Sequence, residues 1–286
     1  MQTPSYPWQP LGAIDPKTLT DSRIQLHYAI QFMAATGAAL AEPQPDYSHT
    51  SLAWNPKFQG FVTLIVPAPT PFRVGLEPVS LTSVLLDEQG QTIAALPLPQ
   101  KTLAEGFDWL RQEITRLGAE ADRVQPLSYP PDDFPDHPIA HGAAFDVTDK
   151  ASRQELANYY ANTLEALQTL TCAEAQDISP VRLWPHHFDL ALLITLPSLP
   201  DDTSRTVGLG LSPGDTSYPE PYWYVSPYPY PDTPSLPALE GKGFWHTQHW
   251  VGAVLTASQL GQNSTTQDQQ LQAFLNSALS ASISLL

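Results

Sequence analysis

Four histidines in the second half of the chain are the residues best suited to metal chemistry. They are His186, His187, His246 and His249. With the carboxylates of Asp189, Asp215 and Glu220, their imidazoles would suit zinc, iron or manganese. Two histidines three residues apart share a face only on a helix, whereas the segment around them is typical of extended chain. A divalent metal cofactor, and with it a metal-dependent hydrolase, is therefore an alternative hypothesis.

An aromatic, proline-rich segment in the same half is the second candidate site. Residues 218–237 are dense in proline and tyrosine, and 244–250 continue the aromatic run. Tyrosine and tryptophan offer large, rigid surfaces with a polar end, which suits them to line a ligand-binding groove. The candidate ligand-binding residues are Tyr222, Trp223, Tyr224, Trp245, Trp250, Asp215 and Glu220.

Three other interpretations of this segment stay open. The rings could instead pack onto a strand, with the prolines stiffening a flap. Asp215 and Glu220 also fit exposed turn acids, one at a strand end and one between two prolines. An exposed flap carrying Tyr228 and Tyr230 could recruit a partner chain.

Other catalytic motifs are absent from the sequence. There is no glycine-rich phosphate loop, dinucleotide-binding fingerprint or nucleophile elbow. The single cysteine, Cys172, excludes an intramolecular disulfide and a thiolate-rich zinc site. Whether the protein is an enzyme stays open at this point.

Composition excludes further classes of function. The chain has 286 residues, with 13 basic and 29 acidic side chains and a net charge of -16, which disfavours binding to nucleic acid and to anionic lipid. Hydrophobic residues make up 42%, enough for a folded core, and the 30 prolines are spread along the chain as rigid turns. Apolar runs are too short to span a bilayer and no secretory pattern opens the chain, so we expect a cytoplasmic protein.

The elements that must position these residues form two similar arrays. Residues 22–67 align with 152–197 without a gap, and each copy opens with an expected capping box, Ser22 with Gln25 and Ser152 with Glu155. An apolar stripe at helical spacing follows in both copies. The positions identical in the two copies are Ser22/Ser152, Arg23/Arg153, Leu26/Leu156, Leu40/Leu170, Trp54/Trp184, Phe58/Phe188 and Pro67/Pro197.

Several strands and a closing helix are expected after each opening helix. Strands are predicted over 60–66, 73–76, 80–86 and 92–96 in the first copy, and over 189–196 and 205–211 in the second. The closing helices are predicted from the capping boxes of Thr102 with Glu105 and of Thr266 with Gln269. Strands joined without intervening helices pair antiparallel. The prediction is an α+β fold of internally duplicated helix-strands-helix units with an antiparallel sheet and pseudo-twofold symmetry.

The expected domain organisation follows from that duplication. A first repeat covers 1–125, a proline-rich connector covers 126–150, and a second repeat covers 151–286. The second repeat carries the proline and aromatic insertion at 212–250, which has no counterpart in the first.

Short motifs along the chain resemble those of a bacterial family. They are Phe188-Asp189-Leu190-Ala191, the Gly210–Asp215 and Pro219–Tyr224 segments, and Leu26-His27 followed by Gln31. Their order is similar to that in a family of uncharacterised proteins, domain of unknown function 5996, over most of the chain. The resemblance implies the α+β architecture and leaves the function open. The chain departs from the family at Trp184-Pro185-His186-His187, so the resemblance does not support the histidine pair; His27 is expected at a helix edge.

The sequence therefore predicts a ligand-binding module for a small molecule or peptide, which uses an aromatic groove in the second repeat. The alternatives are a metal-dependent hydrolase and a structural or protein-interaction protein. No nucleic-acid or membrane partner is expected.

Overall fold

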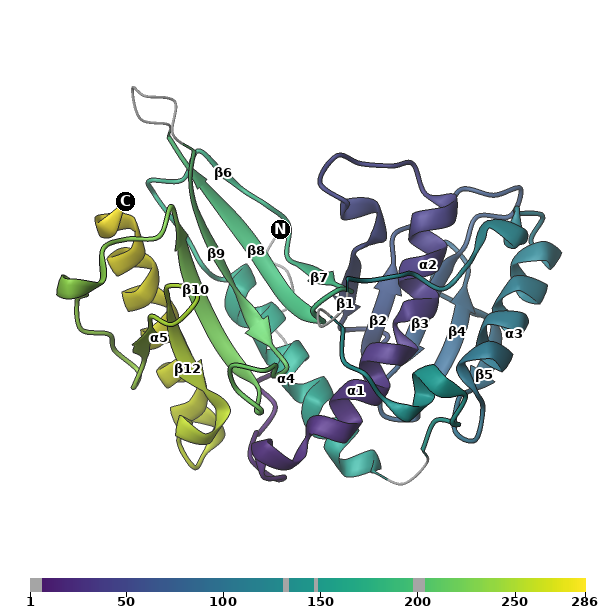
Figure 1. Cartoon of the computed structure of the whole chain (residues 1–286), viewed down its shortest axis with the longest axis horizontal. Helices are drawn as coiled ribbons and strands as arrows, with labels where there is room; N and C mark the ends of the chain where they lie inside the picture. The colour runs from purple at the N-terminus through teal and green to yellow at the C-terminus, as the bar shows by residue number, and fades with distance from the viewer. Residues whose placement is uncertain (1–6, 131–133, 147–148, 198–203) are drawn as a thin grey trace. The chain divides into compact units, whose positions relative to one another are not determined.

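A computed structural model describes residues 7–130, 134–146, 149–197 and 204–286 (Figure 1). The chain divides into two compact units, and neither is contiguous in sequence. The N-terminal unit comprises Leu19–Ala157 and Arg182–Phe188, and the C-terminal unit comprises the residues up to Thr18, Asn158–Val181 and Asp189–Leu286. Residues 131–133 and 147–148 of the expected connector lie outside the described residues.

The N-terminal unit is an antiparallel sheet with α-helices. Its helices are α1 (Thr20–Ala29), α2 (Gln31–Leu40) and α3 (Leu103–Arg116). Its strands, in spatial order, are β7 (Arg182–Trp184), β1 (Leu52–Asn55), β2 (Gly60–Thr63), β3 (Arg73–Glu77), β4 (Thr82–Leu86) and β5 (Thr92–Pro97). Short 3-10 turns lie at η2 (Ser48–Thr50), η3 (Ala121–Arg123) and η4 (Pro138–His141).

Helix packing in this unit depends on one glycine. Helix α2 packs against β2, β3 and α3. The ring of Phe32 in α2 occupies the space beside Gly106 in α3, where a β-carbon would lie 2.3 Å from the ring. The same ring meets Phe107 edge-on, with the centroids 4.9 Å apart. Because all three residues are buried, this contact forms part of the apolar core.

The C-terminal unit is a second antiparallel array. Its helices are α5 (Ser264–Leu285) and the part of α4 (Lys150–Gln168) that begins at Asn158. Its strands, in spatial order, are β11 (Phe244–His246), β12 (Gly252–Thr256), β10 (Tyr222–Tyr228), β9 (Arg205–Ser212) and β8 (Asp189–Leu196), and β6 (Asp177–Ile178) also pairs with β8. The 3-10 turns are η1 (Pro16–Thr18), η5 (Thr233–Ser235) and η6 (Ala257–Gln259). Among the described residues, none of the helices has the length and apolar character needed to cross a membrane.

Alternation along its strands gives this sheet two different faces. One face carries large apolar side chains: Leu209, Leu211 and Trp223 are fully buried, and α5 packs against β9, β10 and β12 (Figure 1). On the same side, the indole Nε1 of Trp223 donates to Thr163 of α4 at 2.8 Å. The opposite face carries small and aromatic residues. We call it the tyrosine face, defined by Gly208, Gly210, Ser212, Tyr222, Tyr224, Gly252, Phe244 and His246.

The α+β class and the antiparallel pairing are confirmed. Strand β8 has the predicted bounds, and β9 and β5 each extend one residue further. The capping box of Thr102 and Glu105 is confirmed, and Gly118 follows the helix with φ 84°. The internal duplication stays a prediction, although helix, strands and helix follow one another in both halves of the chain.

The three other predicted capping boxes are wrong, because each helix begins earlier. Asp149 accepts from the backbone N–H of Ser152, and Asn263 accepts from that of Thr266, so the predicted caps lie three residues beyond the observed ones. Ser22 is buried inside α1, which has no side-chain cap. Asparagine and aspartate compete effectively with serine and threonine for the cap position.

Candidate functional site

A continuous series of rings lies along the tyrosine face. We call it the aromatic row; it consists of Tyr224, Tyr222, Tyr218, Phe244, His246 and Trp250. Ring centroids are 6.3 Å apart for Tyr222 and Tyr224, 5.0 Å for Tyr218 and Tyr222, and 6.1 Å for Tyr218 and Phe244. His246 follows at 5.6 Å from Tyr218, and Trp250 stacks on His246 at 4.3 Å. The row is therefore one packed aromatic stack with fixed geometry, in which Tyr222 is buried and the other five rings are partly exposed.

Two glycines make room for the ends of this row. A β-carbon on Gly210 would lie 2.9 Å from the hydroxyl of Tyr224, so the tyrosine crosses β9 where that strand has no side chain. A β-carbon on Gly252 would lie 2.5 Å from the indole of Trp250. Glycine inside a strand is typical of such close approaches.

The polar ends of the tyrosines are held by carboxylates. The hydroxyl of Tyr224 donates to Oδ2 of Asp189 at 2.7 Å, and that of Tyr222 donates to Oδ2 of Asp215 at 2.6 Å. Both acids lie beside the row, and Asp215 is exposed. One carboxylate thus lies at the Tyr224 end of the row and the other lies beside Tyr222.

Hydrogen bonds also fix the histidine of the row. Nε2 of His246 lies 2.6 Å from the carbonyl oxygen of Gln248, and Nδ1 lies 2.8 Å from the hydroxyl of Tyr218. A carbonyl only accepts, so Nε2 carries the hydrogen, and a neutral ring accepts at Nδ1 from Tyr218.

The charge states of the tyrosines limit the chemistry of the row. Burial, assisted by the negative charge of the neighbouring aspartates, raises the pKa of Tyr222 and of Tyr224. The pKa of Tyr218 is raised by the same two causes. All three phenols therefore stay protonated near neutral pH and act as donors, not as general bases. No position of this face in strands β8–β12 is a lysine or arginine.

The structure divides the sequence-predicted ligand residues into two sets. Tyr222, Tyr224 and Trp250 belong to the row. Trp223 and Trp245 point to the opposite face, where Trp223 is part of the core and Trp245 donates to the carbonyl of Pro237 at 2.7 Å. An aromatic groove formed by all five rings is therefore wrong, because neighbouring strand residues face opposite ways.

The two predicted acids also differ in role. Asp215 accepts from the backbone N–H groups of Ser217 and Tyr218 and so forms a turn, as well as holding Tyr222. Glu220 is 5% exposed and accepts from the backbone N–H and the hydroxyl of Ser258, at 2.6 and 2.9 Å. It fixes the turn after β12, and the expectation of an exposed acid is wrong.

The four histidines proposed as metal ligands do not form a ligand set. His186 stacks on His187 and on Tyr129, with centroids 4.3 and 4.8 Å apart. His246 belongs to the aromatic row, and His249 is exposed. Within residues 7–130, 134–146, 149–197 and 204–286, no three His, Cys, Asp or Glu side chains are placed to hold a metal ion.

His27 lies in a buried cluster of the N-terminal unit and not at a helix edge. Its Nε2 donates to the carbonyl of Pro185 at 2.9 Å, and the amide of Gln31 donates to the same oxygen at 3.1 Å. Tyr129 donates to the side-chain oxygen of Gln31 at 2.7 Å. Burial lowers the pKa of His27 to about 3, so the ring is neutral. The cluster ties α1 and α2 to the turn after β7 and is structural.

Comparisons with other proteins add no family. No protein-family model matches this sequence, and searches of curated proteins and of solved structures give no match. The resemblance to the uncharacterised bacterial family therefore stays a prediction based on short motifs.

Proposed function

We propose that the C-terminal unit is a ligand-binding module whose aromatic row receives a small organic cation. The carrying observation is a row of partly exposed rings beside the carboxylates of Asp189 and Asp215, with no basic residue on that face of the strands. Aromatic faces attract cations through their quadrupole, and carboxylates add direct charge attraction. The net charge of -16 would also increase the encounter rate with cations.

Binding is favoured over catalysis by the state of the polar groups. The hydroxyls of Tyr222 and Tyr224 each donate a hydrogen bond to a carboxylate, and their raised pKa values keep them protonated. Side chains already fixed by hydrogen bonds lose little conformational entropy when a ligand arrives. The row therefore suits recognition by a preformed surface.

Calorimetric titration of the full chain with choline tests this proposal. The matched neutral probe is 3,3-dimethylbutan-1-ol, which has the same shape without the charge. We expect choline to bind about 2- to 30-fold more tightly than the alcohol, the range that a cation–π contact gives. Equal affinities, or no heat with choline at millimolar concentration, would contradict the proposal.

Variants locate the binding to the row. Tyr224→Ala removes a ring and is expected to weaken choline binding, whereas Tyr224→Phe keeps the ring and should retain most of it. Tyr230→Ala is the control, because that ring is 53% exposed and lies outside the row. Loss of binding in the control alone would place the site elsewhere.

A second function is supported by two exposed rings at the end of β10. Tyr228 and Tyr230 are 60% and 53% exposed, and their centroids are 6.5 Å apart. Large exposed aromatic residues are typical of protein–protein contact sites. A mass that rises with concentration by light scattering, and that Tyr228→Ala with Tyr230→Ala abolishes, would support partner recruitment. A constant monomer mass would count against self-association.

Composition adds a proposal about compartment and partners. We propose a cytoplasmic location. We also propose that the protein does not bind nucleic acid, because it has 13 basic and 29 acidic side chains. Retardation of duplex DNA at low salt would contradict the second part.

A further inference from the structure

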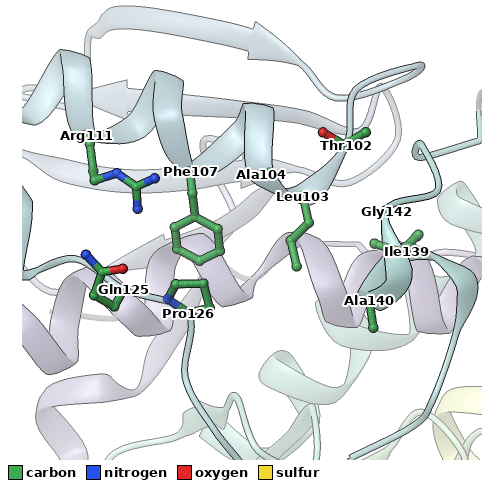
Figure 2. Close-up of a pocket in the computed structure, with 10 residues that line it drawn as sticks. All are labelled: Thr102, Leu103, Ala104, Phe107, Arg111, Gln125, Pro126, Ile139, Ala140 and Gly142. Atoms are coloured by element: carbon green, nitrogen blue, oxygen red, sulfur yellow. The ribbon is translucent and has the colours of Figure 1, made fainter.

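A pocket of about 400 Å³ lies in the N-terminal unit, and none of its lining residues belongs to the aromatic row (Figure 2). Its walls come from the first turns of α3, from the segment that follows η3, and from η4. The lining residues are Thr102, Leu103, Ala104, Phe107, Arg111, Gln125, Pro126, Ile139, Ala140 and Gly142. This volume is within the range of sites for small molecules.

The pocket has an apolar body and one polar end. Phe107 and Pro126 face each other across its middle, and Leu103 and Ala140 continue the apolar wall (Figure 2). At one end, Figure 2 shows the guanidinium of Arg111 beside the amide of Gln125. A ligand that fits is therefore apolar over most of its length and carries hydrogen-bond acceptors at one end.

The guanidinium of Arg111 is held in position and keeps donors to spare. One terminal nitrogen donates to the carbonyl of Val124 at 3.1 Å, and the other donates to Asp108 at 2.7 Å. The group lies 5.9 Å from the centre of the Phe107 ring. Arginine has five N–H donors, so three remain. Asp108 is 75% exposed, and an ion pair with such a residue is strongly screened by water.

We infer that this pocket binds a small monocarboxylic acid with an aliphatic or aryl body. The carboxylate accepts from Arg111, whose planar fork matches a carboxylate better than any other side chain does. The body of the acid lies against Phe107, Pro126 and Leu103, where it loses contact with water. The ligand has the opposite charge to the one proposed for the aromatic row, and the two sites lie in different units.

A calorimetric titration of the full chain with 4-phenylbutyrate tests the inference. 4-Phenylbutan-1-ol is the neutral control with the same body, and acetate is the control with the same charge. We expect the acid to bind about tenfold or more tightly than the alcohol, since a charge-assisted hydrogen bond replaces a neutral one. Acetate is expected to give no measurable heat, because it lacks the apolar body.

Three variants of helix α3 separate the two halves of the site. Arg111→Gln should reduce the affinity for the acid to that for the alcohol and leave the alcohol unchanged. Ala104→Trp should abolish binding of both probes, because Ala104 is exposed and the larger ring would fill the pocket without entering the core. Arg116→Gln is the matched control, since that arginine is 61% exposed on the same helix and does not line the pocket.

The result that supports the inference is loss of selectivity in Arg111→Gln together with loss of all binding in Ala104→Trp, with unchanged circular dichroism. It is overturned if 4-phenylbutyrate does not bind, if the acid and the alcohol bind equally, or if a folded Ala104→Trp variant still binds both. Choline binding at the aromatic row is measured separately, so a failure at one site says nothing about the other.

Discussion

Gly210 lies in the middle of β9, where the side chain of Tyr224 crosses the strand to reach Asp189. A β-carbon at this position would lie 2.6 Å from the carbonyl oxygen of Leu190, 2.8 Å from Cβ of Ala191 and 2.9 Å from the hydroxyl of Tyr224. The first of these neighbours is backbone, which cannot move without disturbing the pairing of β8 and β9. The change Gly210→Ala therefore requires the sheet and the tyrosine to shift together.

The expected cost follows from the extra volume. Inserting a methyl group into a packed region costs about 1–3 kcal/mol. Gly208 is the matched control, two residues earlier on the same strand and face, and its nearest neighbour would be the carbonyl of Ser226 at 4.0 Å. Alanine there meets open space and restricts the unfolded chain, so we expect Gly208→Ala to be neutral or stabilising by about 0.4–1 kcal/mol.

Urea unfolding of the full chain, followed by tryptophan fluorescence, measures both variants. The buried Trp223 reports on this unit, because its side chain contacts α4 behind the sheet. Choline titration of the same samples should show weaker binding for Gly210→Ala only. If the two alanine variants differ by less than about 0.5 kcal/mol, the close approach of Tyr224 to β9 is not what requires glycine.

Two further predictions concern pH and helix capping. The unfolded chain takes up a proton near the ordinary pKa of 6.5, but buried His27 does so only at about 3, so the free energy of unfolding falls as pH drops through that window. The slope due to this residue approaches about 1.4 kcal/mol per pH unit; His27→Gln should remove it, whereas His141→Gln, at an exposed position, should not. Asn263→Ala should lower the free energy of unfolding by about 1 kcal/mol, and by more than Thr266→Ala does, because Asn263 is the observed N-cap of α5. If thermal unfolding shows the larger loss for Thr266→Ala, Thr266 is the cap.

Much of the fold could be predicted from local pattern. The strands predicted at 189–196 and 205–211 agree with β8 and β9 to within one residue. Strands β1 and β7 were missed, because four and three residues are too short to show a period. The opening helix predicted for the first copy is in fact two helices, α1 and α2, separated at Ile30. No glycine or proline marks this break in the sequence.

The sequence predicted several residues of the candidate site but not the face of the sheet toward which each side chain points. Tyr222 and Tyr224 were found together with Trp223, although alternation along a strand places the tryptophan on the other face. That signal was available once the segment was taken as a strand and not as a flap. Tyr218 lies outside the strands, and its place in the row depends on the turn made by Asp215, which no sequence period indicates.

The division of the chain into units that are not contiguous determines the order in which they can be completed during synthesis. The N-terminal unit lacks β7 until Arg182–Phe188 has been made, so one edge of β1 stays unpaired until more than half of the chain has been translated. The backbone N–H of Gln9 donates to the side chain of Asn162, and that of Leu11 donates to Gln267, so neither hydrogen bond can form until its acceptor has been synthesised. Neither half of the gene therefore encodes a complete unit, and the hydrogen bond from Leu11 to Gln267 forms only after Gln267 of α5 has been synthesised.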